Sequence, residues 1–393
     1  MRCERIVTPS GVVAGEVAVG DGQIEAVVGA GVGSDAVELG ERWLVPGYID
    51  MHVHGGGGAQ CNTSDPDEIS ALARFHASHG TTGLLATTVA GPVDELVVAL
   101  GAIARCVDLG GARGGATGAD LGAGDEARVL GAHLEGPFLS PARPGAMDPA
   151  CFVAPDREVL GRLLAAGGGA VRMMTFAPEL PDALDLVQAL VRSGVIASMG
   201  HSDAGYEEAR AAVLAGARAA THLFNGMRPF HHREPGVLGA ALDLPEVSCE
   251  LICDGVHVDP VALRLVYGAK GTAAIRLITD AMQAAGMADG RYRLGGAAVE
   301  VRDGVVRLAE GGSIAGSTLT MDVAVRNAVR FLGIPVEEAV SLASTNPARL
   351  LGVGDRKGAI SVGMDADLVV LDEELLACGT IVGGEWVGGP PAF

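Results

Sequence analysis

Several apolar, strand-like runs of this chain end in a histidine or an acidic residue. Five segments share this form: Asp50–His54, His133–Glu135, Gly200–His201, Thr221–His222 and Thr279–Asp280. In an eight-stranded α/β barrel, the carboxyl ends of all strands lie at one face, and active-site groups come from the ends of several strands. The pattern therefore predicts a barrel in which distant segments converge on one site.

Apolar strand-like runs alternate with amphipathic stretches through the middle of the chain. We count eight candidate strands near 47–53, 82–88, 129–135, 170–176, 195–200, 218–222, 248–253 and 275–280. Helical periodicity intervenes at 67–79, 93–107, 181–192, 204–215 and 260–267, and a glycine-rich surface loop is expected at 109–128. Strongly apolar strands alternating with helices predict a parallel sheet buried on both faces. Eight units favour a closed (β/α)8 TIM-like barrel over an open doubly wound sheet.

The two ends of the chain have a different character, with short strand-like runs separated by turns. Chain termini often lie close together in folded domains. We therefore expect residues 1–46 and 357–393 to form a small β-sandwich domain, with the barrel occupying 47–356. No Gly-x-Gly-x-x-Gly followed by a suitably placed acid is present, so a dinucleotide-binding fold is not expected.

Composition limits the partners that this chain is expected to have. The chain has 393 residues, 49% of them hydrophobic, and a formal net charge of −20, which argues against nucleic acid or an anionic membrane as a partner. Its seven cysteines include no Cys-x-x-Cys pair, which favours reduced thiols in the cytoplasm. No segment resembles a secretory signal or a membrane span.

His52 and His54 form the most specific pair. Side chains two residues apart on a strand point to the same face, so both imidazoles face one side. Two such rings inside a barrel are costly unless they are hydrogen-bonded or bind a ligand. Neutral imidazoles beside a carboxylate suit a borderline metal such as zinc, and we predict that both rings are metal ligands.

The other strand-end groups each have a structural alternative. A glutamate that ends an apolar strand is rarely buried without a partner, so Glu135 is predicted as a ligand and His133 as a core or supporting residue. His201 and His222 could each be a satisfied strand-end histidine, but together they complete a ligand set. Asp280 could cap a helix, or it could take a proton from a metal-activated water and deliver it to a leaving group.

The remaining histidines carry weaker signals. His76 and His79 lie on a predicted helix and are assigned structural roles. His231 and His232 lie in a proline-flanked loop and could line the site or only its rim.

Seven motifs in this order resemble those of the N-acetylglucosamine-6-phosphate deacetylase family, a branch of the amidohydrolase superfamily. They are Pro46–Gly55, His133–Phe138, Gly200–Ser202, Thr221–Met227, Cys253–His257, Thr279–Ala281 and Ala315–Met321. The His-Leu-Glu-Gly-Pro and Thr-His-Leu-Phe-Asn segments are specific to the family, whereas His-x-His marks only the superfamily.

The resemblance implies a site and a reaction. A metal is held by Glu135, His201 and His222, and His52 and His54 could hold a second ion, with Glu135 shared and Asp280 as a further candidate for sharing. Asp280 acts as general base and then acid in hydrolysis of the acetamide of N-acetylglucosamine 6-phosphate, which yields glucosamine 6-phosphate and acetate. His133 is one candidate for oxyanion stabilisation. The substrate contacts that carry over are Ala146, Asn225, Gly226, Arg233, His257, Ile314, Ala315 and Gly316.

This chain departs from the family at two positions. Met147 stands where the family usually has histidine, and a thioether cannot donate a hydrogen bond. Substrate binding at that corner is therefore expected to be weakened or rearranged. Gly226 stands where alanine is usual, which is expected to matter little if the contact is made by the backbone.

Several alternatives stay open from the sequence. Zinc is the expected divalent ion, with iron, cobalt or manganese as alternatives, and one or two ions per subunit. The rival functions are deacetylation of N-acetylgalactosamine 6-phosphate, another amidohydrolase reaction such as cyclic-amide hydrolysis, and a catalytically silent barrel that acts as a binding protein. A homodimer is expected by family analogy.

Overall fold

Eight parallel strands form one sheet in the computed structural model, which describes residues 1–29, 36–107 and 125–391. The strands follow one another around the sheet in chain order: β5 (Tyr48–Val53), β8 (Thr81–Val89), β9 (Arg128–Glu135), β10 (Val171–Phe176), β11 (Ile196–Met199), β12 (Ala219–Ala220), β13 (Ser248–Ile252) and β14 (Ile275–Ile278). These are the eight predicted strands, with ends shifted by a few residues. The predicted barrel is confirmed.

The chain just after β14 closes the sheet against β5. Ala281 forms a parallel bridge with Val53, and the backbone N–H of Asp280 donates to the carbonyl of His52 at 2.9 Å. The N–H of His54 in turn donates to the carbonyl of Ala281 at 2.8 Å. Closure therefore brings the first and last predicted site segments side by side.

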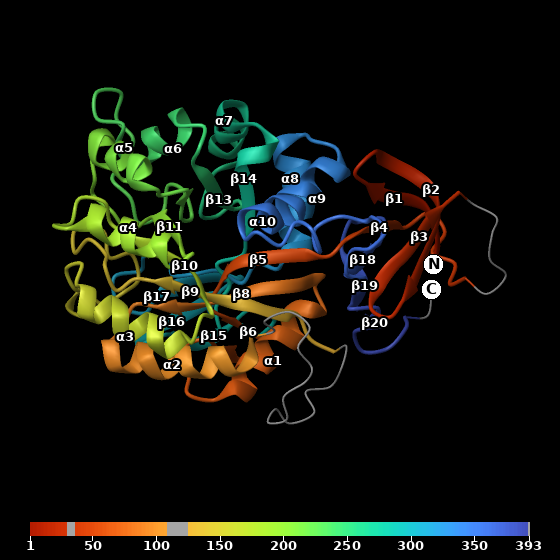
Figure 1. Cartoon of the computed structure of the whole chain (residues 1–393), viewed down its shortest axis with the longest axis horizontal. Helices are drawn as coiled ribbons and strands as arrows, with labels where there is room; N and C mark the ends of the chain where they lie inside the picture. The colour runs from red at the N-terminus through yellow and green to blue at the C-terminus, as the bar shows by residue number, and fades with distance from the viewer. Residues whose placement is uncertain (30–35, 108–124, 392–393) are drawn as a thin grey trace.

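Helices cover the outside of the barrel (Figure 1). Those that alternate with the strands are α1 (Pro66–Ala77), α2 (Val93–Cys106), α3 (Arg157–Gly167), α4 (Ala183–Arg192), α5 (Tyr206–Ala215), α6 (Gly236–Asp243) and α7 (Pro260–Lys270). Three begin at aspartates, Asp65, Asp156 and Asp259, whose side chains accept from free N–H groups of the first turn. Two single 3-10 turns, Pro149–Cys151 and Thr272–Ala274, and the helices α8 (Met321–Leu332), α9 (Val336–Ala343) and α10 (Thr345–Leu350) complete the set.

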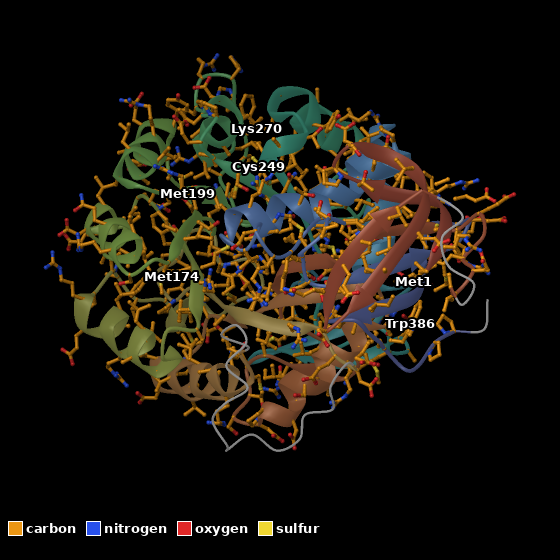
Figure 2. The ribbon with its side chains drawn as sticks, turned by 45° about the vertical axis from the view of Figure 1, so that its right-hand side comes forward. Met1, Met174, Met199, Cys249, Lys270 and Trp386 are labelled. Atoms are coloured by element: carbon orange, nitrogen blue, oxygen red, sulfur yellow. The ribbon has the colours of Figure 1, made fainter. Side chains whose placement is uncertain are left out.

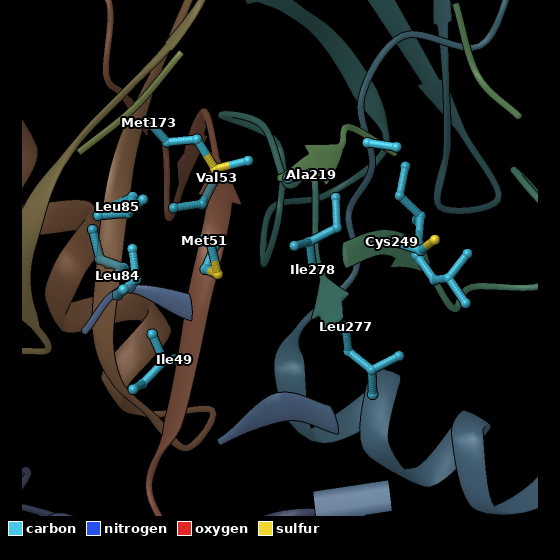
Figure 3. Packing of buried hydrophobic residues seen from close by; sticks show 14 of the residues in the cluster. Ile49, Met51, Val53, Leu84, Leu85, Met173, Ala219, Cys249, Leu277 and Ile278 are labelled. Carbon is cyan, nitrogen blue, oxygen red and sulfur yellow. The ribbon is translucent and has the colours of Figure 1, made fainter. Parts of the chain in front are cut away.

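Apolar side chains fill the space between the strands and the helices. Figure 3 shows part of this core, with Ile49 and Leu84 on one side and Leu277 and Ile278 on the other. All four are essentially inaccessible to solvent. Because strands buried on both faces need such residues at nearly every position, the near-continuous apolar runs in the sequence follow directly.

Both ends of the chain build a separate sheet, as predicted. It joins seven strands: β1 (Arg2–Thr8), β2 (Gly11–Gly20), β3 (Gln23–Val28), β4 (Trp43–Pro46), β18 (Leu368–Leu371), β19 (Ala377–Val382) and β20 (Glu385–Trp386). A bridge between Gln23 and Asp365 links β3 to the C-terminal segment, and the sheet has its own core. Figure 2 shows Met1 and Trp386 on this sheet, apart from Met174 and Met199 in the barrel. The domain limits given above remain predictions.

Two small sheets near the mouth of the barrel were not predicted. β6 (Gly55–Gly56) and β7 (Ala59–Gln60) form a short hairpin, and β15 (Gly290–Leu294), β16 (Ala297–Arg302) and β17 (Val305–Leu308) form an antiparallel meander after β14. The meander packs its own apolar cluster, including Val299 and Val306, against Val89 and Met282.

The structure also bears on the cysteines, the predicted loop and membrane spans. All seven cysteines are unpaired. Most of the loop predicted at 109–128 lies outside the described residues. Within the described part of the chain, no helix is both long enough and apolar enough to cross a membrane.

One helical histidine makes the stability of the fold depend on pH. His76 is fully buried in α1, and its Nε2 donates to the carbonyl of Gly55 at 2.9 Å. Burial lowers the pKa of His76 to about 4. Its neutral form therefore stabilises the fold above the unfolded-state pKa near 6.5, and this contribution is lost progressively as the pH falls from about 6.5 to about 4.

We predict that His76→Gln reduces the acid sensitivity of the fold. Between about pH 7 and pH 5, His76 alone should lower the free energy of unfolding by about 2 kcal/mol, a loss that glutamine cannot show. Denaturant unfolding at the two pH values measures it. His231→Gln, at an exposed loop position, is the control. An unchanged pH dependence in His76→Gln contradicts the prediction.

Candidate metal centre

The five predicted metal ligands and Asp280 meet at the carboxyl ends of the barrel strands. Glu135 Oε1 lies 2.8 Å from Nε2 of His222 and 3.1 Å from Nε2 of His201. Its other oxygen, Oε2, lies 3.3 Å from Nε2 of His54. One carboxylate thus connects ligands from three other segments of the barrel.

A second group of donors adjoins the first. Nε2 of His54 lies 3.1 Å from Nε2 of His52 and 3.1 Å from Oδ1 of Asp280. Nε2 of His52 lies 3.5 Å from Oε1 of Glu135. The sets His52–His54–Asp280 and His52–Glu135–His222 each present donor atoms within 4.8 Å of one another, so the cluster is able to hold a metal ion.

The hydrogen bonds behind the rings show which nitrogen faces the cluster. Nδ1 of His54 donates to the carbonyl of Thr87 at 3.0 Å, and Nδ1 of His201 donates to that of Arg143 at 2.9 Å. In their neutral form, rings held in this way direct the lone pair of Nε2 inward, where a cation can take the place of a proton. Nε2 of His201 and Nε2 of His222 lie only 3.1 Å apart. Converging lone pairs and carboxylates fit a cation, because neither group repels one.

The same crowding of negative charge alters the proton affinity of the cluster. Burial by itself lowers the pKa of His54, but hydrogen bonds to Asp280 and Glu135 raise it to about 9. Burial would raise the pKa of Asp280, yet the hydrogen bond from His54 and the nearby imidazoles lower it to about 2. The site therefore attracts positive charge and keeps Asp280 ionised at neutral pH.

The backbone turns sharply where three of these residues leave their strands. His201, His222 and Asp280 have φ angles of 46°, 26° and 50°, in the left-handed region that non-glycine residues seldom adopt. Each lies two residues beyond the end of its strand, so this turn aims its side chain across the barrel mouth.

Two glycines leave room for His201. A Cβ on Gly145 would lie 2.8 Å from Cε1 of the His201 ring, and a Cβ on Gly226 would lie 2.8 Å from its Nδ1. Both glycines also have positive φ angles. Gly226 thus has a steric role beside the ring, in addition to the substrate contact that the family resemblance implies.

A cavity of about 240 Å³ opens above the cluster. It is lined by seven of the eight predicted substrate residues: Ala146, Asn225, Gly226, His257, Ile314, Ala315 and Gly316. The exception is Arg233, which lies in an exposed loop with His231 and His232, and none of the three is among the described residues lining this cavity. A role for Arg233 in substrate binding remains a prediction.

His257 is held in place by a neighbouring acid. Its Nδ1 donates to Oδ2 of Asp254 at 2.6 Å, while Oδ1 of Asp254 accepts from the backbone N–H groups of Val256 and His257. Burial lowers the pKa of His257, but the hydrogen bond and charge of Asp254 outweigh it, so the pKa is raised overall. A ring that favours the protonated form suits an anionic ligand group.

Three apolar residues complete one wall of the cavity: Val89, Met147 and Leu294. Met147, which departs from the family pattern, packs in the same apolar cluster as the meander residues Val299 and Val306. Val89 ends β8, but the strand-end pattern singled out only histidines and acids and so did not mark this valine. Leu294 belongs to the unpredicted meander, and no local sequence signal marks it.

His133 lies below the cluster, away from the cavity. Its Nδ1 donates to the carbonyl of Met51 at 3.2 Å, and its Nε2 accepts from the hydroxyl of Thr175 at 2.8 Å. Both ring nitrogens are therefore engaged, which fits the predicted core or supporting role. It does not fit the alternative of oxyanion stabilisation.

We predict that Gly145→Ala weakens metal binding. The new methyl group would meet the His201 ring at a backbone conformation that alanine adopts at a cost of about 1–3 kcal/mol, so the ring must shift. A loss of roughly tenfold or more in affinity for the first Zn²⁺ ion is expected, measured by competition with a chromophoric chelator. Gly161→Ala, in α3 with open space around it, is the control. Equal affinity in both variants would refute the assignment.

Comparison with known proteins agrees with this geometry. The chain is 42% identical over 354 residues to N-acetylglucosamine-6-phosphate deacetylase of Lysinibacillus sphaericus, covering 90% of this chain and 87% of that protein. It is 40% identical over 376 residues to N-acetylgalactosamine-6-phosphate deacetylase of Escherichia coli O157:H7, covering 95% of each.

A solved structure matches equally well. The crystal structure of N-acetyl-D-glucosamine-6-phosphate deacetylase from Mycobacterium smegmatis superposes with a TM-score of 0.90 and 39% identity, covering 98% of this chain and 99% of that one. The model of the Amidohydrolase family matches residues 43–387. With its barrel, its ligand cluster and these relatives, this chain belongs to the amidohydrolase family.

Proposed function

We propose that this protein hydrolyses the acetamide of N-acetyl-D-glucosamine 6-phosphate to D-glucosamine 6-phosphate and acetate. The observation that carries the proposal is the convergence of Glu135, His201, His222 and Asp280 at one cavity, with His257 facing the same space. Relatives with this named activity, at 38–42% identity, support the choice of substrate.

The donor set favours two divalent ions, with zinc as the proposed metal. Glu135, His201 and His222 would hold the first ion, while His52 and His54 would hold the second, with Glu135 shared. Imidazole nitrogen and carboxylate oxygen are ligands that zinc accepts readily. When bound, such a cation supplies Lewis acidity, which lowers the pKa of water to roughly 7 and polarises a carbonyl group.

Asp280 is the proposed proton carrier. Its carboxylate lies at the edge of the ligand cluster, with Oδ1 3.1 Å from Nε2 of His54, and it remains ionised at neutral pH. It therefore can accept the proton of the attacking water and deliver it to the departing nitrogen of the substrate. Bond cleavage then releases the amine of the sugar and acetate.

Different walls of the cavity would bind different parts of the substrate. His257, oriented by Asp254, would bind the phosphate with a charge-assisted hydrogen bond. The loop Ile314–Gly316 and the segment Asn225–Gly226 would hold the sugar through polar groups. Such contacts far from the reacting amide provide binding energy that orients it.

We further propose the cytoplasm as the compartment, from the seven unpaired cysteines, and a homodimer, from family analogy.

The second candidate substrate is the C4 epimer, N-acetylgalactosamine 6-phosphate. A relative named for that activity is 40% identical to this chain over 95% of its length. A comparison of kcat/KM for the two epimers decides between them, and a higher value for the galactose epimer would replace the first proposal.

Replacing Asp280 by Asn should abolish turnover. The amide keeps the shape of the side chain but cannot accept and return a proton, so kcat should fall by roughly 10²–10⁴-fold or more. The far-ultraviolet circular dichroism spectrum and the unfolding midpoint should stay close to native values. Asp243→Asn, an exposed residue that accepts from Tyr206, is the matched control. Normal activity in Asp280→Asn rules out this assignment.

The phosphate should matter more than any other part of the sugar. We expect kcat/KM for the 6-phosphate to exceed that for unphosphorylated N-acetylglucosamine by at least about tenfold, since a charge-assisted bond contributes about 1.5–3 kcal/mol. His257→Asn should reduce this preference while turnover of the unphosphorylated sugar changes little. Equal turnover of both sugars by the native enzyme would exclude a phosphate subsite.

A further inference from the structure

A second buried glutamate lies beneath the metal cluster. Glu250, in the middle of β13, is 1% exposed. Its Oε2 lies 3.1 Å from Nδ1 of His52 and accepts from the backbone N–H of His222 at 3.2 Å. Its Oε1 is buried without a hydrogen-bond partner among the described residues. Both of its hydrogen bonds thus end on residues of the cluster.

His52 is supported differently from the other imidazoles of the cluster. His54 and His201 donate from Nδ1 to backbone carbonyls, and Nδ1 of His222 is buried with no partner in the described structure. Only His52 among these four has a carboxylate behind its Nδ1. A carboxylate accepts more strongly than a carbonyl, fixes the proton on Nδ1 and makes Nε2 a better metal ligand.

Glu250 also belongs to a set of side chains, His52, His133 and Glu250, whose donor atoms lie close enough to bind an ion themselves. The hydrogen bonds argue against this alternative. Nδ1 of His133 donates to Met51 and Nε2 accepts from Thr175, so neither nitrogen is free for a metal. A supporting role for Glu250 is therefore the better explanation of its burial.

We propose that Glu250 is a positioning residue of the metal centre, which holds His52 with Nε2 toward the second ion and ties that ring to the backbone of His222. Through this link, one oxygen atom joins a ligand at the start of the barrel to a ligand after β12. The inference rests on the metal centre of the proposed function, and it makes Glu250 a determinant of affinity for the second ion.

The test is metal binding to the full chain, without reference to activity. Metal-free protein is titrated with Co²⁺ and followed by visible absorption, and Zn²⁺ affinities are measured by chelator competition. Glu250→Gln should bind the second ion 10–100-fold more weakly, while affinity for the first changes by less than about threefold. Glu246→Gln, an exposed glutamate just before β13, is the matched control. Native affinity for both ions in Glu250→Gln overturns the proposal.

A double-mutant cycle separates positioning from a general structural role. If Glu250 acts through His52, then His52→Asn and His52→Asn/Glu250→Gln should bind metal alike to within about threefold. Losses that multiply in the double variant overturn the inference. The Zn²⁺-loaded native protein provides a check that needs no variant: its crystal structure should show Nε2 of His52 on the ion and Glu250 on Nδ1. An ion bound by Glu250, or a ring turned over, contradicts the assignment.

The outcomes distinguish this inference from the proposed function. Native protein that binds two ions but deacetylates neither amino-sugar phosphate would refute the function and leave the role of Glu250 open to the same titrations. Native protein that binds a single ion and is an active deacetylase would overturn the role of Glu250 while the function stands.

Discussion

The structure depends on one electrostatic constraint, which is the gathering of carboxylates and imidazoles in a buried space at the barrel mouth. Glu135 contacts His54, His201 and His222 through its two oxygens, and the rings direct Nε2 toward it. Taken out of water, such a concentration of lone pairs and negative charge is unfavourable unless positive charge enters. This requirement raises the pKa of His54 and makes the cluster suitable for a cation.

Barrel closure makes that convergence possible. Asp280 follows the last strand and His52 lies on the first, and they are neighbours because the backbone of the one donates to the backbone of the other. The small sheet supports the same strand from its other end. β4, which leads into β5, pairs with β18. The backbone N–H of Gly47, between β4 and β5, donates to the carbonyl of Asp367. Both termini thus fix the start of the strand that carries the His-x-His pair.

The interior of the barrel beneath the cluster is polar, where barrels of this class are often filled with branched aliphatic side chains. Hydroxyls of Thr175, Ser198 and Thr221 form a connected chain that ends on His133. Glu250 lies in the same interior and contacts His52. Because each member is held by another, this layer gives the ligands above it little freedom to rotate, which is the geometric condition for a preorganised metal site.

The sequence by itself determined the eight strands and pointed to the residues proposed as ligands, because alternation of apolar residues and the residue at a strand end are local properties. It also pointed to seven cavity-lining residues through family motifs. Glu250 was within reach of the same reasoning, since it is an acid inside an apolar run. The partner of Glu250 could not be predicted in this way, because His52 lies 198 residues away in the sequence. Only the closed barrel decides which side chains face each other, where Arg233 and Leu294 lie relative to the cavity, and which nitrogen of each ring faces the cluster. These depend on contacts between strands, and no local period encodes them.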